Sequence, residues 1–296
     1  MDTALPAEFS FLVASASGFT GTRVVHLLLE RGHAVRAFVH RVDQRSEALA
    51  NAGAEIAVGD LLRFEDVSSA MEGVGSAYFV YPIAPGLMDA TATFAQAAAE
   101  NKIRAIVNMS QISARRYSES NAAQQHWIAE RILDWGPTPV THMRPTFFAE
   151  WLVKHGRSVA QENVLRLPLE EGRHAPIAAE DQAHVITATL EDPEPHAGKV
   201  YELFGPEEFN HYEIAEIFSR VLGRTVEYEP ISVETFEQNL TKAGRSPHLV
   251  QHLCAVAVDY RKGLFSGTND VVERIGKKSG TTLESFIEQN RALFTA

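Results

Sequence analysis

The residues best suited to chemistry follow a short apolar run near the N-terminus. Phe11, Leu12 and Val13 lead into the small-residue turn of residues 15–21, after which helical spacing begins. Glycine in such a turn lets the backbone approach a pyrophosphate closely, and the N–H groups of a helix N-terminus attract its charge. The turn therefore predicts a dinucleotide-binding site that is formed by Ser15, Ser17, Gly18, Phe19, Thr20 and Gly21.

Ser15 stands where a turn of this kind usually has its first glycine. Its backbone N–H can still face a phosphate and its hydroxyl can donate to a phosphate oxygen, but serine does not ensure the glycine conformation. A Gly-x-x-Gly sequence also occurs in ordinary strand-to-helix turns, so close packing is an alternative explanation for Gly18 and Gly21.

The end of the second apolar run discriminates between the two nicotinamide cofactors. An acid there hydrogen-bonds the ribose hydroxyls of NAD, whereas a base accepts the 2′-phosphate of NADP. Here His40 and Arg41 follow Val39, and no acid stands directly at the strand end. These residues predict NADPH, with NADH as the alternative. A second interpretation is that Arg41 and Arg45 only face solvent.

Strand-like apolar runs alternate with helical segments through the first half of the chain. This alternation predicts an α/β fold with a doubly wound parallel sheet, in which ligands bind at the carboxyl ends of the strands. The expected strands are Phe9–Val13, Ala34–Val39, Glu55–Val58, Ser76–Val80, Ala105–Met109 and Val140–Met143. The expected helices begin near Thr22, Gln44, Phe64, Gly86 and Ala122.

The regular alternation of strands and helices ends after Pro145, where short strands mix with longer helical segments. The expected strands are Leu165–Leu167 and Lys199–Leu203, and the expected helices are Ala179–Leu190, Tyr212–Leu222, Val233–Ala243, Pro247–Arg261 and an amphipathic tail over Thr282–Phe294. We therefore predict a cofactor-binding domain over residues 1–150 and a smaller, mostly helical substrate-binding region over residues 151–296. The boundary is soft, because strands of the second region can return to the main sheet.

Composition and charge exclude several classes of function. The 296 residues include 38 acids and 27 bases, and the net charge of −11 disfavours a nucleic-acid partner. The single cysteine, Cys254, excludes an internal disulfide, and its apolar neighbours favour a buried structural thiol over a nucleophile. The histidines are scattered, so no metal site is predicted.

The chain carries no recognisable targeting segment. Residues 1–8 contain two acids and no basic stretch, unlike a signal peptide, and no apolar run reaches membrane-spanning length. We expect a soluble, cytoplasmic protein, and the sequence does not predict its oligomeric state.

Five stretches, in this order, resemble the NmrA-like branch of the atypical short-chain dehydrogenase/reductases, and the similarity runs through nearly the whole chain. They are the turn of residues 15–21, Gly59-Asp60-Leu61, Met109-Ser110, the segment from His126 to Glu130, and the segment from Met143 to Glu150. The resemblance implies a Rossmann fold. It also implies either an NAD(P)H-dependent reductase of quinones, dyes or related acceptors, or a catalytically silent redox sensor.

The resemblance also assigns roles to residues that follow the third and fourth strands. It places Asp60 and Leu61 beside the adenine, where a carboxylate can accept the exocyclic amine, although aspartate is also a common helix cap. Tyr81 and Pro82 would lie close to the nicotinamide and its ribose, with simple packing as the alternative.

The catalytic residues depart from the wider superfamily, whose members use a serine followed by Tyr-x-x-x-Lys. When the glutamate that often follows that lysine is aligned on Glu130, His126 takes the place of the lysine and Ala122 that of the tyrosine. The resemblance implies that His126 bridges nicotinamide and substrate or donates a proton. The alternative is a histidine on the helix surface that pairs with Glu130 one turn later.

The remaining candidates concern the substrate. Ser110 matches the serine of the superfamily and also contributes to the cofactor site, and Tyr117 could supply a substitute hydroxyl. Phe147, Phe148 and Trp151 could stack on a flat aromatic substrate, although three neighbouring aromatics also suit a core.

Loss of the catalytic tyrosine favours acceptors that delocalise the charge of an incoming hydride, such as quinones and conjugated aromatics. The hypothesis is thus a reductase of a small aromatic or quinone-like substrate, including a biosynthetic tailoring step on a polycyclic aromatic. The alternative is a non-catalytic NAD(P)-sensing regulator that acts through a protein partner.

Overall fold

The computed structural model of the chain describes residues 9–295, so the signal-peptide prediction for residues 1–8 lies outside the described residues. The chain forms two compact units, each assembled from several segments. The first unit contains the chain up to Ser110, Gln125–Arg144 and Gln182–Tyr201, and the second contains Gln111–Gln124, Pro145–Asp181 and the chain from Glu202 onward. The chain thus passes between the units several times, and the first passage to a long stretch of the second unit lies at Pro145.

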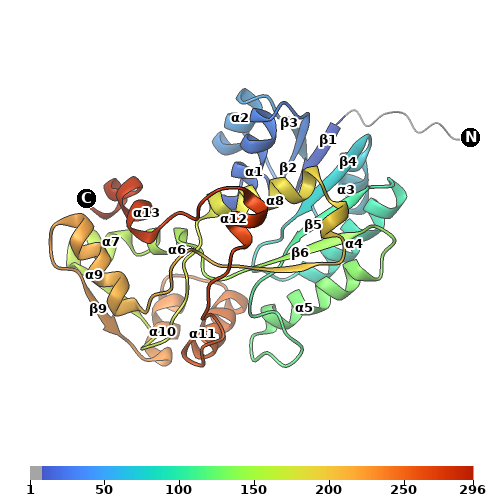
Figure 1. The fold of residues 1–296 in the computed structure, drawn as a ribbon. Helices are drawn as coiled ribbons and strands as arrows, with labels where there is room; N and C mark the ends of the chain where they lie inside the picture. Colours follow the sequence, from blue (N-terminus) through green and yellow to red (C-terminus); the bar gives the residue numbers. More distant parts are fainter. Residues whose placement is uncertain (1–8, 296) are drawn as a thin grey trace, which may run out of the picture. The chain divides into compact units, whose positions relative to one another are not determined.

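A seven-stranded sheet with the order β3-β2-β1-β4-β5-β6-β8 organises the first unit (Figure 1). Its strands are β1 (Phe9–Val13), β2 (Val35–Val39), β3 (Glu55–Val58), β4 (Val74–Phe79), β5 (Ala105–Met109), β6 (Val140–Pro145) and β8 (Val200–Leu203). The neighbouring pairs from β3 to β6 are parallel. The predicted doubly wound parallel sheet is confirmed, and each of the six expected strands lies within two residues of an observed one. The apolar central strands β2 and β5 are buried throughout, as two covered faces require.

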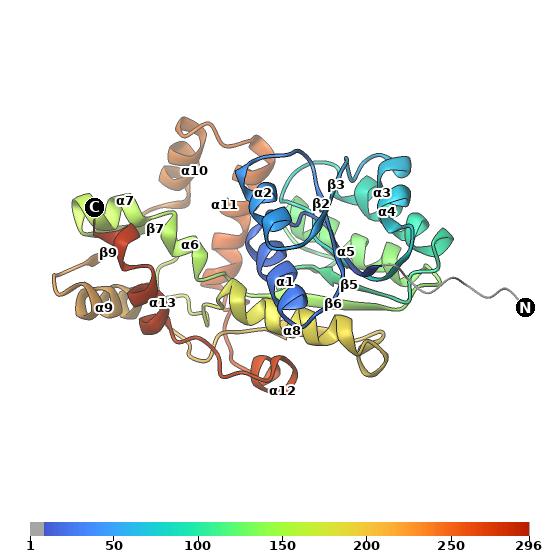
Figure 2. The ribbon, with the colours of Figure 1, turned by 90° about the horizontal axis from the view of Figure 1, so that it is seen from above.

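Helices cover both faces of this sheet, with α1 and α8 on one face and α3, α4 and α5 on the other (Figures 1 and 2). The helices that follow the strands are α1 (Phe19–Glu30), α2 (Gln44–Asn51), α3 (Phe64–Met71), α4 (Leu87–Glu100), α5 (Asn121–Asp134) and α8 (Ala179–Glu191). Local sequence explains where these helices begin. Asp43 caps α2 in a capping box with Ser46, and Gly86 adopts a left-handed conformation before α4.

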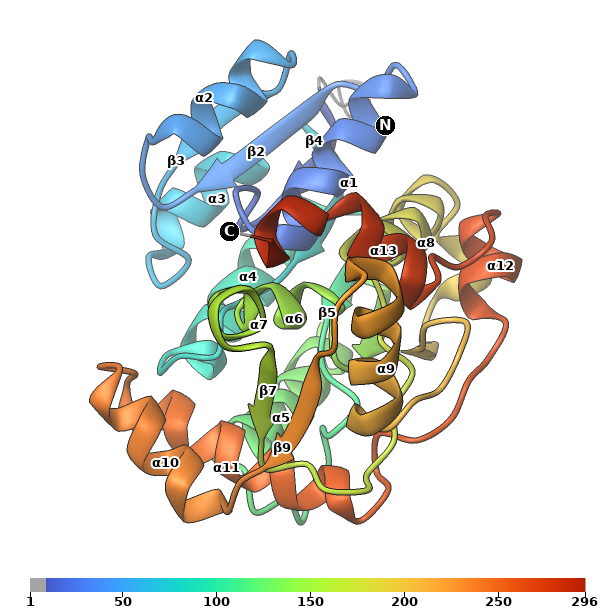
Figure 3. The ribbon, with the colours of Figure 1, turned by 90° about the vertical axis from the view of Figure 1, so that its left-hand side faces the viewer.

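The second unit is mostly helical, and Figure 3 shows its two strands side by side with α9 next to β9. Its elements are α6 (Glu150–Val153), α7 (Gly156–Glu162), β7 (Val164–Leu167), α9 (His211–Leu222), β9 (Glu227–Pro230), α10 (Val233–Lys242), α11 (Pro247–Arg261), α12 (Val271–Gly276) and α13 (Leu283–Gln289). The strands β7 and β9 are parallel. The expected tail helix over Thr282–Phe294 is interrupted at Asn290, after which a short 3-10 turn follows. Among the described helices, none combines the length and the apolar character that a bilayer-spanning segment needs.

Candidate functional site

The turn between β1 and α1 has the geometry of a phosphate-binding turn. A methyl group added to Gly21 would lie 2.7 Å from the Ser15 carbonyl oxygen and 2.9 Å from Ala16 Cα, so only glycine allows the helix to pack this closely on the turn. Gly18 is the N-cap of α1, and within the described chain no side chain caps this end and no acid lies in its first turn. The positive end of the helix dipole therefore remains available to an anion.

Ser15 adopts the left-handed backbone conformation that glycine usually supplies at this position. Its φ is +48°, in the left-handed region, and its hydroxyl donates to the Val80 carbonyl at 2.9 Å. The hydroxyl thus ties the turn to the end of β4. A bond from this hydroxyl to a phosphate would have to replace the bond to Val80.

Two substitutions of Ser15 separate the contribution of its hydroxyl bond from the cost of its left-handed backbone conformation. Ser15→Ala loses the hydrogen bond and keeps the left-handed conformation, so we expect the free energy of unfolding to fall by about 1 kcal/mol. Ser15→Gly loses the same bond but relieves strain of about 1 kcal/mol, so its stability should lie close to that of the wild type. Urea denaturation measures both, and a glycine variant less stable than the alanine variant would contradict this account.

Two arginines near the end of β2 differ in their contacts, because Arg45 makes short hydrogen bonds and Arg41 has, among the described residues, only a long ion pair. Arg45 hydrogen-bonds the Asp43 carboxylate at 2.7 Å and donates to the Ser17 carbonyl at 3.3 Å, and its hydrogen bond lowers the pKa of Asp43. Arg41 is exposed and lies 3.9 Å from the same carboxylate, and His40 is exposed beside it. The cofactor roles of His40 and Arg41 stay predictions, and Arg41 has the greater freedom to meet a ligand phosphate.

Asp60 and Tyr81 make local contacts at the ends of their strands. The Asp60 carboxylate accepts the Leu62 N–H at 2.9 Å, which is a bond within the turn rather than a helix cap, because the N-cap of α3 is Arg63 and no described side chain caps that helix. Leu61 is buried in the core and Pro82 is exposed. The Tyr81 hydroxyl donates to the Pro85 carbonyl at 3.0 Å, and burial raises its pKa, with the Asp60 and Asp89 carboxylates adding to the effect.

A buried carboxylate organises the ends of β5 and β6. Glu130 is fully buried, and it accepts hydrogen bonds from Ser110 Oγ at 2.6 Å and from Arg144 Nε at 2.8 Å. A second bond joins Arg144 Nη2 to Glu130 Oε2 at 2.5 Å. The Ser110 hydroxyl therefore uses its only hydrogen in the bond to Glu130. Toward any other group, Ser110 can accept a hydrogen bond but cannot donate one. The sequence did not predict the Glu130–Arg144 pair.

His126 lies on α5, one turn before Glu130. It is only 4% exposed, so the alternative of a histidine on the helix surface is wrong. The first unit thus contains the turn of residues 15–21, the loops after β2, β3 and β4, and Ser110, each of which follows the carboxyl end of a strand, together with His126 on α5.

The three aromatic residues predicted to bind substrate line one cavity of the second unit. Phe147, Phe148 and Trp151 border a space of about 240 Å³ whose other walls are largely apolar. Phe147 stacks on Phe265 with ring centroids 4.7 Å apart, so it also belongs to the core, as the alternative held. Tyr117 is 79% exposed and does not belong to the described lining of this cavity.

Sequence analysis missed a polar cluster at this cavity. His155, His174 and His211 line it, and the Tyr260 hydroxyl lies 2.5 Å from His174 Nδ1 and 3.2 Å from His211 Nδ1. Burial lowers the pKa of His155 to about 4 and that of His174 to about 3, and holds that of His211 well below its usual range. These imidazoles are therefore neutral at physiological pH.

The neutral histidines make stability depend on pH. Between about pH 6.5 and the lowered pKa values, the unfolded chain binds protons that the folded chain does not, so stability falls as the pH drops. Each buried histidine should remove about 1 kcal/mol of unfolding free energy between pH 7 and about pH 5.5. His174→Gln should reduce this dependence in urea titrations, whereas the exposed control His40→Gln should not. Equal dependence in both variants would contradict the assignment.

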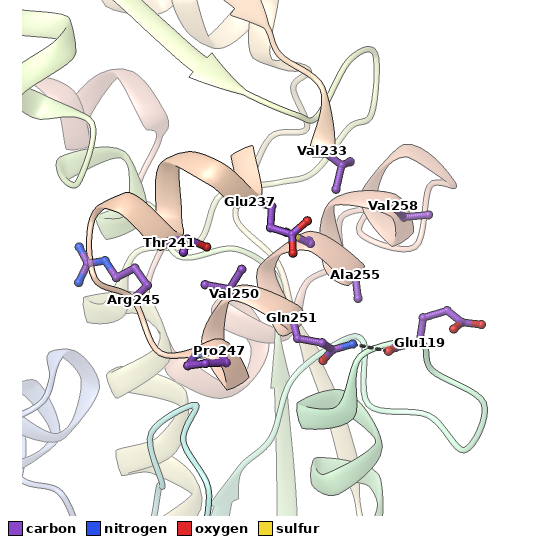
Figure 4. Close-up of a pocket in the computed structure, with 11 residues that line it drawn as sticks. Glu119, Val233, Glu237, Thr241, Arg245, Pro247, Val250, Gln251, Ala255 and Val258 are labelled. Carbon is purple, nitrogen blue, oxygen red and sulfur yellow. Dashed lines mark hydrogen bonds between the residues drawn. The ribbon is translucent and has the colours of Figure 1, made fainter. Parts of the chain in front are cut away.

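A second, more open hollow lies between α10 and α11, where Gln251 Nε2 donates to the Glu119 carbonyl at 2.7 Å (Figure 4). Cys254 borders it and is half-buried, rather than buried as expected. Burial raises the pKa of its thiol, and the Glu237 and Glu234 carboxylates raise it further. The thiol is thus protonated at neutral pH, which agrees with a structural rather than a nucleophilic cysteine.

Comparison with known proteins agrees with the described fold. The NAD(P)H azoreductase of Xenophilus azovorans is 26% identical over 290 residues, which cover 96% of this chain and 99% of the relative. The structure of the NADPH-dependent quinone oxidoreductase QOR2 of Escherichia coli, complexed with NADPH, superposes with a TM-score of 0.85 at 21% identity, over 95% of this chain and 99% of that one. The Citrobacter sp. triphenylmethane reductase, complexed with NADP(H), gives a TM-score of 0.83 at 24% identity, with coverage of 95% and 99%.

At these identities the solved structures establish a shared fold. The model of the NmrA-like family matches residues 10–284, which include the turn, the sheet and most of the second unit. The sequence resemblance is confirmed, and the chain belongs to the NmrA-like family.

Proposed function

We propose that the chain is an NADPH-dependent reductase of a quinone-like or otherwise conjugated aromatic acceptor. The observation that carries the proposal is the turn of residues 15–21, where Gly21 leaves no room for a side chain and the N-terminus of α1 faces outward without a capping carboxylate among the described residues. Such a turn fits the pyrophosphate of a dinucleotide. The names of the azoreductase and of the NADPH-bound quinone oxidoreductase support the same assignment.

The residues of the first unit would hold the cofactor in distinct ways. The N–H groups of Ser17 and Phe19 would meet the pyrophosphate, whereas the Gly18 N–H donates to the Ser15 carbonyl within the turn, and Arg41 would pair with the 2′-phosphate. Asp60 and Leu61 would border the adenine, and Tyr81 and Pro82 the nicotinamide ribose. When bound, the nicotinamide would supply a hydride.

The residues expected near the nicotinamide suit acceptors whose reduction needs little general-acid catalysis. The Ser110 hydroxyl donates its hydrogen bond to Glu130, and Ala122 stands in the place of the superfamily tyrosine. A quinone, an azo compound or an enone spreads the charge of the incoming hydride over conjugated atoms, so proximity supplies most of the catalysis. His126, which is buried on α5, is the residue we propose to protonate the reduced product or to hold the nicotinamide.

Turnover with a panel of acceptors tests the proposal. Purified protein should oxidise NADPH in the presence of quinones, azo compounds or enones, and His126→Ala should lower kcat by about tenfold or more. His26→Ala replaces a histidine of α1 that belongs to no proposed site. This variant is the matched control and should leave turnover unchanged. Failure of the wild type to oxidise NADPH with any acceptor would refute the proposal.

The second candidate is a non-catalytic NAD(P)-sensing regulator. It is favoured by the missing Tyr-x-x-x-Lys and by the commitment of Ser110 to Glu130. A regulator of this kind would bind reduced and oxidised cofactor with similar affinity, show no turnover and hold a protein partner in pull-down experiments. NADPH-dependent turnover at rates typical of enzymes would exclude it.

Arg41 provides a test of cofactor choice. Arg41→Ala removes the exposed cation that we assign to the 2′-phosphate, so the Kd for NADPH should rise by about tenfold while that for NADH changes little. Arg104→Ala, an exposed arginine that precedes β5, is the control of matched charge. Fluorescence titration with both cofactors measures the effect, and an equal loss of NADPH and NADH affinity in Arg41→Ala would contradict the assignment.

A further inference from the structure

The cavity of the second unit has largely apolar walls and a few polar lining residues. Phe148, Trp151 and Leu253 are among its apolar residues, while His174 and His211 form a pair among its polar ones. The two imidazole rings lie face to face, with centroids 5.5 Å apart and planes inclined by 16°. Its volume of about 240 Å³ is slightly below the usual range for drug-sized ligands, so it suits a ligand of two or three small rings.

The backbone holds these two histidines in register. His174 and Phe209 exchange two backbone hydrogen bonds of 3.0 and 2.8 Å, which fixes His174 beside the start of α9, where His211 is the first residue. Gly172 leaves the space that the Tyr260 ring occupies, since a methyl group there would lie 2.3 Å from Tyr260 Cδ1. The histidine pair and the tyrosine are thus built into the core of the unit.

The Tyr260 hydroxyl imposes opposite tautomers on the two histidines. It has one proton, which it can donate to the Nδ1 of one ring, so the Nδ1 of the other ring must carry a proton and donate to the tyrosine oxygen. A neutral imidazole has only one N–H. One histidine therefore has a protonated Nε2 and the other an unprotonated Nε2, and the pair offers one donor and one acceptor.

The charges around the cavity disfavour a cationic ligand. Lys154 and Arg245 line it, and no aspartate or glutamate occurs in its described lining. Lys154 Nζ lies 3.6 Å from the centroid of the Trp151 ring, so a positive charge already occupies one aromatic wall. Burial lowers the pKa of Lys154, and the nearby Arg245 charge adds to the effect.

We propose that this cavity binds a flat aromatic acceptor that carries a hydroxyl group beside a conjugated carbonyl, in its neutral or phenolate form, and that His174, His211 and Tyr260 select it. The protonated Nε2 of one histidine would donate to the carbonyl of such a compound. The unprotonated Nε2 of the other histidine would accept from its hydroxyl. The inference rests on the proposed function only in calling the ligand an acceptor, because binding itself requires no turnover.

Binding to the full-length protein without cofactor tests the proposal. Three probes are titrated by quenching of tryptophan fluorescence: 2-hydroxy-1,4-naphthoquinone, unsubstituted 1,4-naphthoquinone and a cationic triphenylmethane dye. The hydroxyquinone should bind about tenfold more tightly than the unsubstituted quinone, and the cationic dye most weakly. Equal binding of the two quinones, or tightest binding of the cation, would overturn the proposal.

The tyrosine hydroxyl has a matched control in the same unit. Tyr260→Phe should remove most of the preference for the hydroxyquinone, whereas Tyr212→Phe, which changes a more exposed tyrosine next to His211, should retain it. Loss of affinity for both quinones by the same factor in Tyr260→Phe would indicate a packing role only and would overturn the selective role.

A measurement on the wild type covers the case in which Tyr260→Phe fails to fold. In nitrogen-15 spectra of histidine-labelled protein, the imidazoles assigned to His174 and His211 should appear as opposite neutral tautomers, and the hydroxyquinone should shift both. Two identical tautomers, or no shift on binding, would overturn the proposal. Tight binding without NADPH oxidation would refute the reductase but retain this site, whereas oxidation of NADPH without the hydroxyquinone preference would refute this site alone.

Discussion

Gly21→Ala is expected to raise the Kd for NADPH by about 100-fold or more. The new methyl group would lie 2.7 Å from the Ser15 carbonyl oxygen and 2.9 Å from Ala16 Cα, and both are backbone atoms that cannot rotate away. The helix must therefore move off the turn, and the N–H groups that we propose to meet the pyrophosphate move with it. A 100-fold loss corresponds to about 2.7 kcal/mol of binding free energy, within the range of displaced charge-assisted hydrogen bonds.

A matched glycine separates this effect from a general loss of stability. Gly198 has a φ of +70°, but a methyl group there would meet no atom within 4 Å, so Gly198→Ala costs conformational strain alone. Both variants are compared by cofactor titration and by thermal unfolding. If Gly21→Ala bound NADPH as tightly as Gly198→Ala does, the turn would not be the phosphate site.

Glu130→Ala should lower the unfolding free energy of the protein by about 3–5 kcal/mol. Glu130 is fully buried, and the side chain of its partner Arg144 is 19% exposed, so removal of the carboxylate takes the Glu130 charge away from a largely buried guanidinium. Ser110 also loses its acceptor. The midpoint of thermal unfolding should fall by roughly 10 °C.

Two controls define the cause of this loss. Glu130→Gln keeps an acceptor oxygen of similar shape and should lose less stability than the alanine variant. Glu47→Ala removes an exposed acid from α2 and should change stability by less than about 0.5 kcal/mol. A Glu130→Ala protein as stable as Glu47→Ala would show that the buried network contributes nothing.

Much of the first unit could be predicted from the sequence, because strands such as β2 and β5 are buried on both faces and several of its turns contain glycine or a capping residue. β5, with the sequence Ala-Ile-Val-Asn-Met, has only one polar residue and was predicted to the residue. The hydrogen bond of the Ser15 hydroxyl could not be predicted, because its partner, the Val80 carbonyl, is 65 positions away.

The second unit was harder to predict for a physical reason. β9 has the sequence Glu-Tyr-Glu-Pro, and only Tyr228 is buried, so it lacks the apolar run that indicates a strand; its pairing with β7 defines it. The cavity histidines come from three separate segments, and no local spacing links His174 with His211 and Tyr260. The predicted boundary near residue 150 stays a prediction, as do the catalytic roles of His126, Ser110 and Tyr117.

A single-turnover experiment tests the central claim most directly. The protein is loaded with one equivalent of NADPH and mixed with 1,4-naphthoquinone, and the absorbance of the bound NADPH is followed. We predict that it decays while one equivalent of quinone is reduced, and that Gly21→Ala shows no such phase at the same concentrations. Bound NADPH that persists in the presence of the quinone, and of azo compounds and enones tested in the same way, would contradict the account.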